Sequence, residues 1–193
     1  MIFLRLLLRR WWIIILILFT TLLSTVVLTY FQTPIYSSAA TYVVAPSTEI
    51  LDGTGLLSGL SVLGGQPSVA NTYASIAASA FVKQKASGAM GLGSTQTRSL
   101  SVFSRVQTGT NIIEITVEGN DPLLVRDFTT KIGESTVDYV NNLNGVYTLA
   151  LLDRAMAPVE PIKPNKKLNL IMGAALGLVQ GVGIAFLTGL NEY

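Results

Sequence analysis

The chain has no cysteine and no histidine among its 193 residues. Their absence excludes disulfide bonds, thiol nucleophiles, imidazole acid or base catalysis, and metal sites that use thiolate or imidazole ligands. The sequence therefore predicts no catalytic residue, no cofactor and no metal ligand, and a protein that is not an enzyme. A chain without cysteine also suits export from the cytoplasm, although reducing compartments tolerate it as well.

Charged residues are scarce and evenly balanced. Only 12% of the residues are charged, half are apolar, and the mean hydropathy is +0.52, which is too apolar for an ordinary soluble domain. Residues 31–167 contain ten Lys and Arg residues and ten Asp and Glu residues, so their net charge is zero. This segment has no basic surplus that would attract a nucleic acid, and we expect no nucleic-acid partner.

The apolar excess lies at the two ends of the chain. Residues 11–30 and 168–190 contain no charged side chain, and each run reaches the length of about 20 residues that crosses a bilayer. Trp11 and Trp12 begin the first run and Tyr30 ends it, as expected for aromatic residues at the two interfaces. The sequence predicts two transmembrane helices in contact with membrane lipid.

The arginines before the first run set the expected orientation. Arg5, Arg9 and Arg10 favour the cytoplasmic side of a membrane helix, so residues 1–10 are predicted to be cytoplasmic. The same basic segment could begin a cleaved signal peptide. The apolar region of a signal peptide is usually about 7 to 15 residues long, shorter than this run, and we therefore favour a retained helix.

Two crossings would place residues 31–167 outside the cytoplasmic membrane and return residues 191–193 to the cytoplasm. Lys163, Lys166 and Lys167 precede the second run on the outer side, which weakens the charge argument without reversing it. Long lysine stems can lie along apolar surface while the ammonium groups reach the headgroups. We retain a two-pass topology with both termini in the cytoplasm.

The outer segment alternates between strand and helix patterns. β-Branched and aromatic residues predict strands, whereas apolar residues at spacings of three and four predict helices. In chain order the expected elements are a strand over 35–46, a helix over 68–87, strands over 99–107 and 110–118, a helix from Pro122 to about 142–145, and a strand over 146–156. The βαββαβ order predicts an α+β fold, a ferredoxin-like extracytoplasmic domain between two transmembrane helices.

The two expected helices have recognisable apolar faces and one has a recognisable start. In the first helix one face would hold Val69, Tyr73, Ile76, Ala80 and Phe81, and in the second Leu124, Phe128 and Ile132 recur every four residues. Asn120 or Asp121 can cap the second helix, and Pro122 fits its first turn.

Two patterns in the outer segment resemble catalytic motifs but have simpler explanations. The sequence LDGTG at 51–55 has one feature of an aspartic protease, but no second copy exists, and the Gly- and Ser-rich stretch 47–66 predicts a mobile loop. Glu114 and Glu118 share one face of a strand. Arg105 on the neighbouring strand favours a cross-strand ion pair.

Three prolines stand at a spacing of three before the second apolar run. Pro158, Pro161 and Pro164 match the period of polyproline II, a stiff helix without internal hydrogen bonds. The segment 157–167 is therefore predicted to form a rigid spacer at the membrane surface, or simply a stiff linker. A PxxP ligand for a cytosolic adaptor is a third reading, but the expected topology puts the motif outside.

The second apolar run carries glycines on one face. Gly173, Gly177 and Gly181 recur every four residues, a spacing that lets another helix approach closely. Gln180 lies among them and could form a hydrogen bond across helices. The alternative is that these glycines have no special role, because glycine is common in membrane helices. Since three glycines share one face of the helix, we favour a helix-packing face.

Four segments in this order resemble a known family: PIYSSAATYVV after the first run, NTYASIAASAFV, NIIEITVEGNDPLLVRDFTTKI, and TLALLDRAMAPVEPIKPNKKLNL before the glycine-rich run. Together they are similar to the chain-length-determinant (Wzz-type) polysaccharide co-polymerases, and the resemblance extends from about residue 11 to 190. It implies an outer α/β domain that assembles into a homo-oligomeric ring and sets the length of an exported polysaccharide beside a polymerase or export machinery. The resemblance supplies no active site.

The same resemblance implies which residues couple the protein to its partners. Helix packing and coupling would fall to the three prolines, the glycine face with Gln180, and the juxtamembrane Lys166 and Lys167. Long helical extensions found in enterobacterial members have no room here, so the chain resembles the short form. Short members usually act with a tyrosine kinase, and because only residues 191–193 follow the second run, we expect no fused kinase domain.

Two other functions fit the same sequence pattern. The chain could be a membrane adaptor that activates a separate cytoplasmic tyrosine kinase, with Tyr193 as a phosphorylation site, although a terminal tyrosine is more often incidental. It could also be a structural subunit of another membrane complex that uses the same fold, because a fold does not determine a function.

Overall fold

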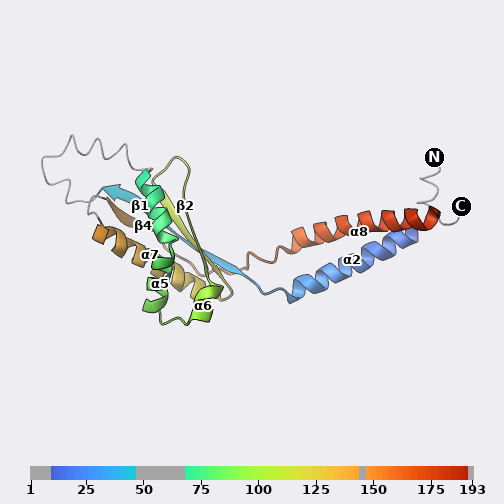
Figure 1. Ribbon diagram of the computed structural model, residues 1–193, viewed down its shortest axis with the longest axis horizontal. Helices are drawn as coiled ribbons and strands as arrows, with labels where there is room; N and C mark the ends of the chain where they lie inside the picture. The colour runs from blue at the N-terminus through green and yellow to red at the C-terminus, as the bar shows by residue number, and fades with distance from the viewer. Residues whose placement is uncertain (1–9, 47–67, 144–146, 191–193) are drawn as a thin grey trace. The chain divides into compact units, whose positions relative to one another are not determined.

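The computed structural model describes residues 10–46, 68–143 and 147–190. The chain divides into two compact units, one formed by residues 1–34 and 162–193 and the other by residues 35–161. Their elements, all but β3 labelled in Figure 1, follow one another in this order: α2 (Trp11–Phe31), β1 (Tyr36–Pro46), α5 (Ala80–Ala89), α6 (Ser94–Ser99), β2 (Ser101–Val106), β3 (Ile112–Gly119), α7 (Pro122–Leu143), β4 (Tyr147–Asp153) and α8 (Lys166–Leu190). A further helical stretch covers 68–77. The expected loop over 47–66, with LDGTG, lies outside the described residues.

The second unit contains one four-stranded antiparallel sheet. Its strand order is β2-β3-β1-β4, so β1 lies between β3 and β4. This arrangement follows from the βαββαβ order, because the helices carry the chain across the sheet while β2 and β3 form a hairpin. The hairpin turns at Gly109, whose φ of 76° belongs to the left-handed region that glycine adopts without a steric penalty. The predicted fold class is confirmed.

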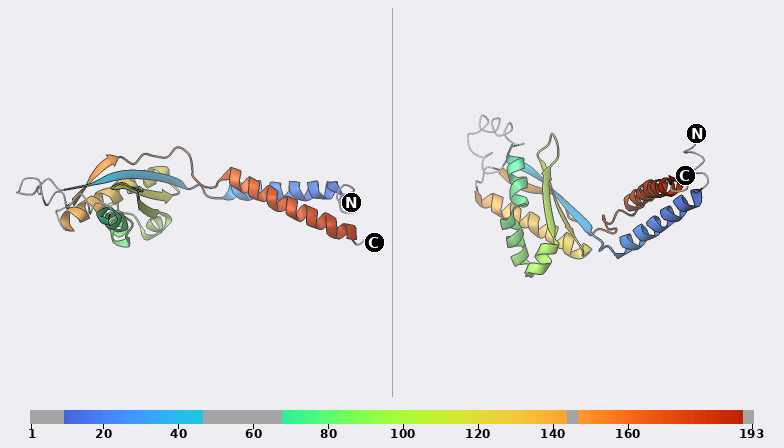
Figure 2. Two further views of the ribbon diagram at one scale, coloured as in Figure 1. Left: turned by 90° about the horizontal axis from the view of Figure 1, so that it is seen from above. Right: turned by 45° about the vertical axis from the view of Figure 1, so that its right-hand side comes forward.

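Helices cover one face of the sheet and leave the other open (Figure 2, left view). Alternate residues of β3 show this division, because Ile113, Ile115 and Val117 are buried whereas Glu114 and Thr116 on the opposite face are only partly buried. A period of two in burial is expected of a strand with one face against the core. The strand sequence therefore determines which face receives the helices.

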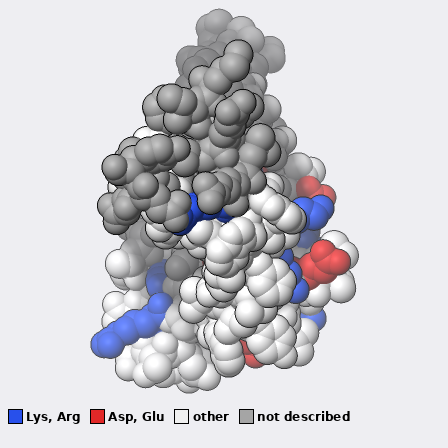
Figure 3. Space-filling view, turned by 90° about the vertical axis from the view of Figure 1, so that its right-hand side faces the viewer, with Lys and Arg blue, Asp and Glu red and all other residues white. Residues whose placement is uncertain are grey.

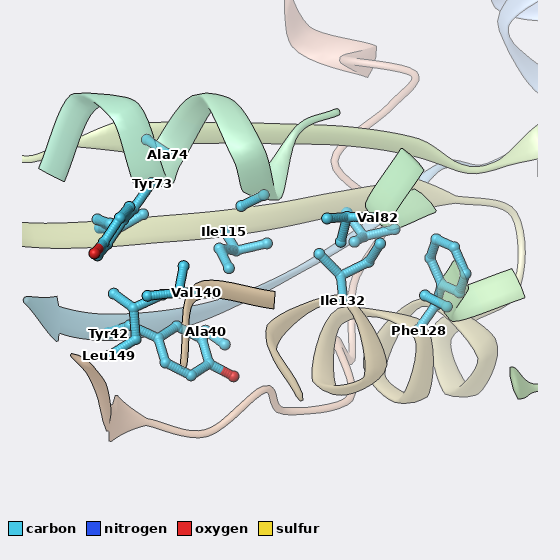
Figure 4. Close-up of a cluster of buried hydrophobic side chains, with 14 of the residues drawn as sticks. Ala40, Tyr42, Tyr73, Ala74, Val82, Ile115, Phe128, Ile132, Val140 and Leu149 are labelled. Atoms are coloured by element: carbon cyan, nitrogen blue, oxygen red, sulfur yellow. The ribbon is translucent and has the colours of Figure 1, made fainter. Parts of the chain in front are cut away.

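The hydrophobic core lies between the sheet and the helices that cover it, namely the helical stretch 68–77, α5 and α7 (Figure 4). Phe128, Ile132 and Val140 of α7 are completely buried against the covered face. Burying side chains of this size stabilises a fold by about 1.5–3 kcal/mol each. The predicted four-residue spacing of Phe128 and Ile132 is confirmed as the core face of the helix, with Leu124 partly buried at its edge.

The single helix expected over 68–87 is wrong. Helix 68–77 ends before Ser79, whose backbone is extended with φ −70° and ψ 151°, and α5 then begins at Ala80. The Ser79 hydroxyl accepts a hydrogen bond from the Val82 amide at 3.3 Å, and this N-cap starts a new helix. The break changes the direction of the chain, so α5 presents a different face to the core and Phe81 is 59% exposed instead of buried.

The apolar face of the broken helix also differs from the expectation. Ala80 is exposed, whereas Tyr73 is buried and Val69 and Ile76 are partly buried. Phe81 packs instead beside Tyr139 of α7, with ring centroids 5.3 Å apart. The helical spacing of apolar residues could not reveal this break, because Ser79, where the first helix is interrupted, is also compatible with the interior of a helix.

The first turn of α7 is formed as predicted. Asp121 accepts hydrogen bonds from the amides of Leu123 at 2.9 Å and Leu124 at 3.2 Å, while Pro122 occupies the first helical position. The carboxylate satisfies two amides that the helix itself cannot pair. Asp121 rather than Asn120 is therefore the cap.

The first unit contains two long apolar helices. α2 (Trp11–Phe31) and residues Lys166–Thr188 of α8 are each long and apolar enough to cross a membrane. α8 begins two residues before the expected span because Asn165 caps it, accepting a hydrogen bond from the Leu168 amide at 3.1 Å. Most of the described surface in Figure 3 belongs to uncharged residues, drawn in white.

Candidate helix-packing and coupling site

The glycine face of α8 is buried against α2. Gly173, Gly177, Gly181 and Ala185 recur every four residues and are the buried residues of the described part of α8. Every fourth residue of a helix lies on the same side, so these four small residues form one stripe. We call them the small-residue stripe.

The two helix backbones come close along this stripe. A Cβ atom added to Gly181 would lie 3.1 Å from Ile14 Cα and 3.2 Å from the Ile14 carbonyl oxygen. At Gly177 it would lie 3.2 Å from Leu18 Cα, and at Gly173 it would lie 2.5 Å from Thr25 Oγ1. A side chain at these positions would force neighbouring atoms of α2 to move, whereas glycine permits the close approach, which gains dispersion contacts between helices.

The facing surface of α2 consists of residues that sequence reasoning missed. Ile14, Leu18, Thr21 and Thr25 contact the stripe at spacings of four, three and four. Thr21 and Thr25 donate their hydroxyl protons to carbonyls one turn earlier, Ile17 and Thr21, each at 2.8 Å. With their polar hydrogens satisfied, the threonines can face an apolar interface. The four-residue spacing of Thr21 and Thr25 could have indicated this packing face, but the two threonines lie in a long apolar run and were not singled out.

One polar contact joins the two helices near the beginning of α8. Asn169 Nδ2 donates a hydrogen bond to Thr29 Oγ1 over 3.1 Å. Asn169 stands four residues before Gly173 and so continues the line of the small-residue stripe. A hydrogen bond between helices in lipid contributes about 0.6 kcal/mol on average, so this one mainly sets the register of the pair.

Gln180 does not join the small-residue stripe. It is exposed on α8, whereas its neighbour Gly181 is buried. Gly183 is also off the stripe, since an added Cβ there would meet nothing within 4 Å. The packing face therefore consists of Gly173, Gly177 and Gly181 alone among the glycines whose surroundings the structure describes in α8.

The proline segment is not one straight rod. Pro158 and Pro164 are partly buried and Pro161 is exposed, and the chain bends at 159–160 and again at 162 and 164. A proline fixes only its own φ, so the two residues between successive prolines remain free to turn. The prediction of a single stiff polyproline II spacer was too simple.

Lys166 and Lys167 occupy the first turn of α8, and both are exposed. Cations at this end of a helix are opposed by the helix dipole. The described parts of the first unit, 10–34 and 162–190, contain no Asp or Glu in their sequence. These two lysines therefore have no carboxylate available within the described part of their unit.

On the open face of the sheet, Arg105 and Glu114 form an ordinary ion pair. Arg105 and Glu114 lie opposite each other in the β2–β3 register and their charged groups are 3.0 Å apart. Arg105 is 74% exposed, so the pair contributes at most about 1 kcal/mol. The predicted cross-strand ion pair is confirmed. Among the described residues no group of three or more acidic side chains is placed to hold a metal ion.

Buried polar contacts fix both ends of β1. Ser38 Oγ donates to the Met156 carbonyl at 2.7 Å, and Asn111 Nδ2 donates to the Val44 carbonyl. The first contact ties the chain that follows β4 to the beginning of β1. Neither residue lies in a recognisable motif, so neither could be chosen from the sequence.

Comparison with known proteins supports the family resemblance. The family model "Chain length determinant protein" (Wzz) matches residues 1–89. A solved structure described as a full-length bacterial polysaccharide co-polymerase has a similar fold, with a TM-score of 0.59 and 11% sequence identity over 98% of this chain and 97% of the other. A search of curated protein sequences finds no match. The resemblance to chain-length-determinant co-polymerases is thus confirmed by a sequence-family match and by the fold.

Proposed function

We propose that this chain is a non-catalytic, oligomeric membrane scaffold that regulates the chain length and export of a surface polysaccharide or exopolysaccharide. One observation carries the proposal: the whole chain, both apolar helices included, has the fold of a full-length polysaccharide co-polymerase. The match to the chain-length-determinant family over residues 1–89 supports it independently.

The proposed topology is a two-pass protein of the cytoplasmic membrane. Residues 11–30 and 168–190 cross the bilayer, residues 1–10 and 191–193 are cytoplasmic, and residues 31–167 lie outside. The hydropathy of α2 and α8 supports the two crossings, and the arginines before α2 support the orientation. Outside, the sheet domain can meet an exported polymer that no cytoplasmic protein reaches.

The small-residue stripe has a structural role in this proposal. Gly173, Gly177 and Gly181 hold α8 against α2 within one chain, so contacts between copies in a homo-oligomeric ring use other surfaces. The exposed Gln180 faces away from the stripe and is available for such a contact. Pro158, Pro161 and Pro164 limit the conformations of the segment between β4 and α8, and thereby couple the outer domain to the membrane.

The partners that follow from this proposal are membrane lipid, further copies of the chain, and a polysaccharide polymerase or export machinery. A regulator of this kind acts by positioning other proteins. Activation of a separate tyrosine kinase remains the alternative function, and no contact in the described residues favours it.

The test is the size distribution of the cell's own polysaccharide. Deletion of the gene should change the modal length of the surface or secreted polymer on a sizing gel, while the repeating unit stays the same. Reintroducing the wild-type gene should restore the original distribution. An unchanged distribution in a strain that still makes the polymer would contradict the proposed function.

A further inference from the structure

A groove opens between α2 and α8 close to the beginning of α8. Its volume is about 320 Å³. Five of its residues present mainly carbon surface or a hydroxyl group, and one is cationic; the lining residues are Thr25, Val26, Thr29, Tyr30, Leu170 and Lys166. The groove lies wholly within the helix unit and adjoins the small-residue stripe, because Thr25 lines the groove and also faces Gly173.

The groove combines an apolar wall with an unbalanced positive charge. Val26 and Leu170 are 54% and 46% exposed, and Lys166 stands beside them in the first turn of α8. The described parts of this unit contain no Asp or Glu, whereas Lys166 and Lys167 stand side by side at the start of α8. The described part of the unit therefore provides no carboxylate that could neutralise the ammonium groups in the first turn of α8.

We propose that this groove binds one anionic glycerophospholipid, with an acyl chain along Val26 and Leu170 and the phosphate beside Lys166. The inference goes beyond the proposed function but rests on its placement of α2 and α8 in a membrane. A tyrosine such as Tyr30 belongs at the level of the headgroups. An ammonium group there attracts an anionic headgroup, whereas a zwitterionic lipid carries no net charge.

This site also explains why lysines stand on the side of the membrane where the orientation rule disfavours them. A bound anionic lipid neutralises Lys166 locally. It occupies the groove beside the Asn169–Thr29 hydrogen bond that joins α2 and α8. The lipid thus becomes a third component of the helix pair at the outer surface.

The test is native mass spectrometry of the full-length protein in mild detergent, titrated with a phosphatidylglycerol or a phosphatidylcholine of identical acyl chains. Wild-type protein should retain the phosphatidylglycerol preferentially. Lys166→Gln should lower that affinity about fivefold, the factor that corresponds to about 1 kcal/mol per lysine at an anionic surface. Lys167→Gln is the matched control, because Lys167 does not line the groove, and it should change retention less than Lys166→Gln does.

A second pair of variants tests the apolar wall. Val26→Trp should fill the groove and reduce phosphatidylglycerol retention, whereas Val27→Trp, at another exposed position of α2 outside the groove, should leave it unchanged. Equal retention of the two lipids by wild-type protein would overturn the proposal, as would equal losses in Lys166→Gln and Lys167→Gln. Displacement of phosphatidylglycerol by an equimolar isoprenyl phosphate would overturn the choice of a glycerophospholipid. None of these results depends on polysaccharide, so they are distinguishable from a failure of the proposed function.

Discussion

At the scale of single residues, two glycines are fixed by what lies opposite them. Gly133 of α7 faces the Tyr42 ring of β1, and an added Cβ would lie 1.8 Å from the tyrosine oxygen and 2.5 Å from Cζ. Gly181 faces the backbone of α2. In both places the missing side chain lets two elements approach, one pair in the sheet domain and one in the helix unit.

Gly133→Ala should destabilise the sheet domain although alanine is the better helix former. The ring of Tyr42 must move, and such overpacking costs about 1–3 kcal/mol, more than the gain of about 1 kcal/mol in helix propensity. Gly88→Ala in α5, where nothing lies within 4 Å of an added Cβ, is the control and should be neutral or slightly stabilising. Denaturant unfolding of both variants measures the difference. A loss at Gly88 as large as that at Gly133 would refute the steric explanation.

Tyr42 should also make the domain sensitive to alkali. Burial, and secondarily the negative charge of Glu134, raise the pKa of Tyr42 above its usual value of 10.0. Because the folded state holds the proton more tightly, the associated stability is complete below about pH 10 and is lost as the pH rises through the raised pKa. Tyr42→Phe should lose less free energy of unfolding than wild type between about pH 8 and pH 11. Identical losses in the two proteins would contradict this.

Gly181→Val should separate α8 from α2. Its Cβ would press on backbone atoms of Ile14 at 3.1–3.2 Å, and backbone cannot move aside as a flexible side chain can. We expect a loss of about 1–3 kcal/mol in detergent unfolding followed by circular dichroism. Gly183→Val adds the same side chain to the same helix in open space and should unfold like wild type.

At the scale of elements, caps and breaks determine where helices begin. Asp121 starts α7 and Asn165 starts α8, and both are short polar residues beside a proline, which the sequence displays openly. Ser79 also starts a helix, but it lies within a run of alanines that reads as continuous helix. The start of α7 was predicted because two independent signals, a capping residue and Pro122, coincide there. The cap at Asn165 was not predicted, because the expected span was set by the uncharged run from residue 168, and the lone Ser79 has too many alternatives.

Asp121→Ala should destabilise the protein by about 1 kcal/mol, the usual cost of losing a cap. The reason is that the amides of Leu123 and Leu124 lose their acceptor. Asp138→Ala, which removes an exposed carboxylate 3.7 Å from Lys85, should cost less than half as much because surface ion pairs contribute little. Chemical denaturation monitored by circular dichroism compares the two. Equal losses would remove the capping explanation.

At the scale of the whole molecule, the order of elements and the open antiparallel sheet could be predicted because alternation, turns and caps are local signals. The contact partners of the glycine face were missed because α2 is largely apolar, and the helical spacing of Thr21, Thr25 and Thr29 on its packing face was not recognised. The bends among the prolines were likewise hidden. Their spacing constrains three residues, whereas the direction of the chain depends on the residues between them.

The central claim is that α2 and α8 hold the sheet domain outside the cytoplasm, where it can act on an exported polymer. Because the chain has no cysteine, a single cysteine reports its own location when it reacts with a membrane-impermeant maleimide. Thr108→Cys, in the exposed β2–β3 turn, should be labelled in intact spheroplasts, and Glu192→Cys only after lysis. Labelling of Thr108→Cys only after lysis would contradict the claim.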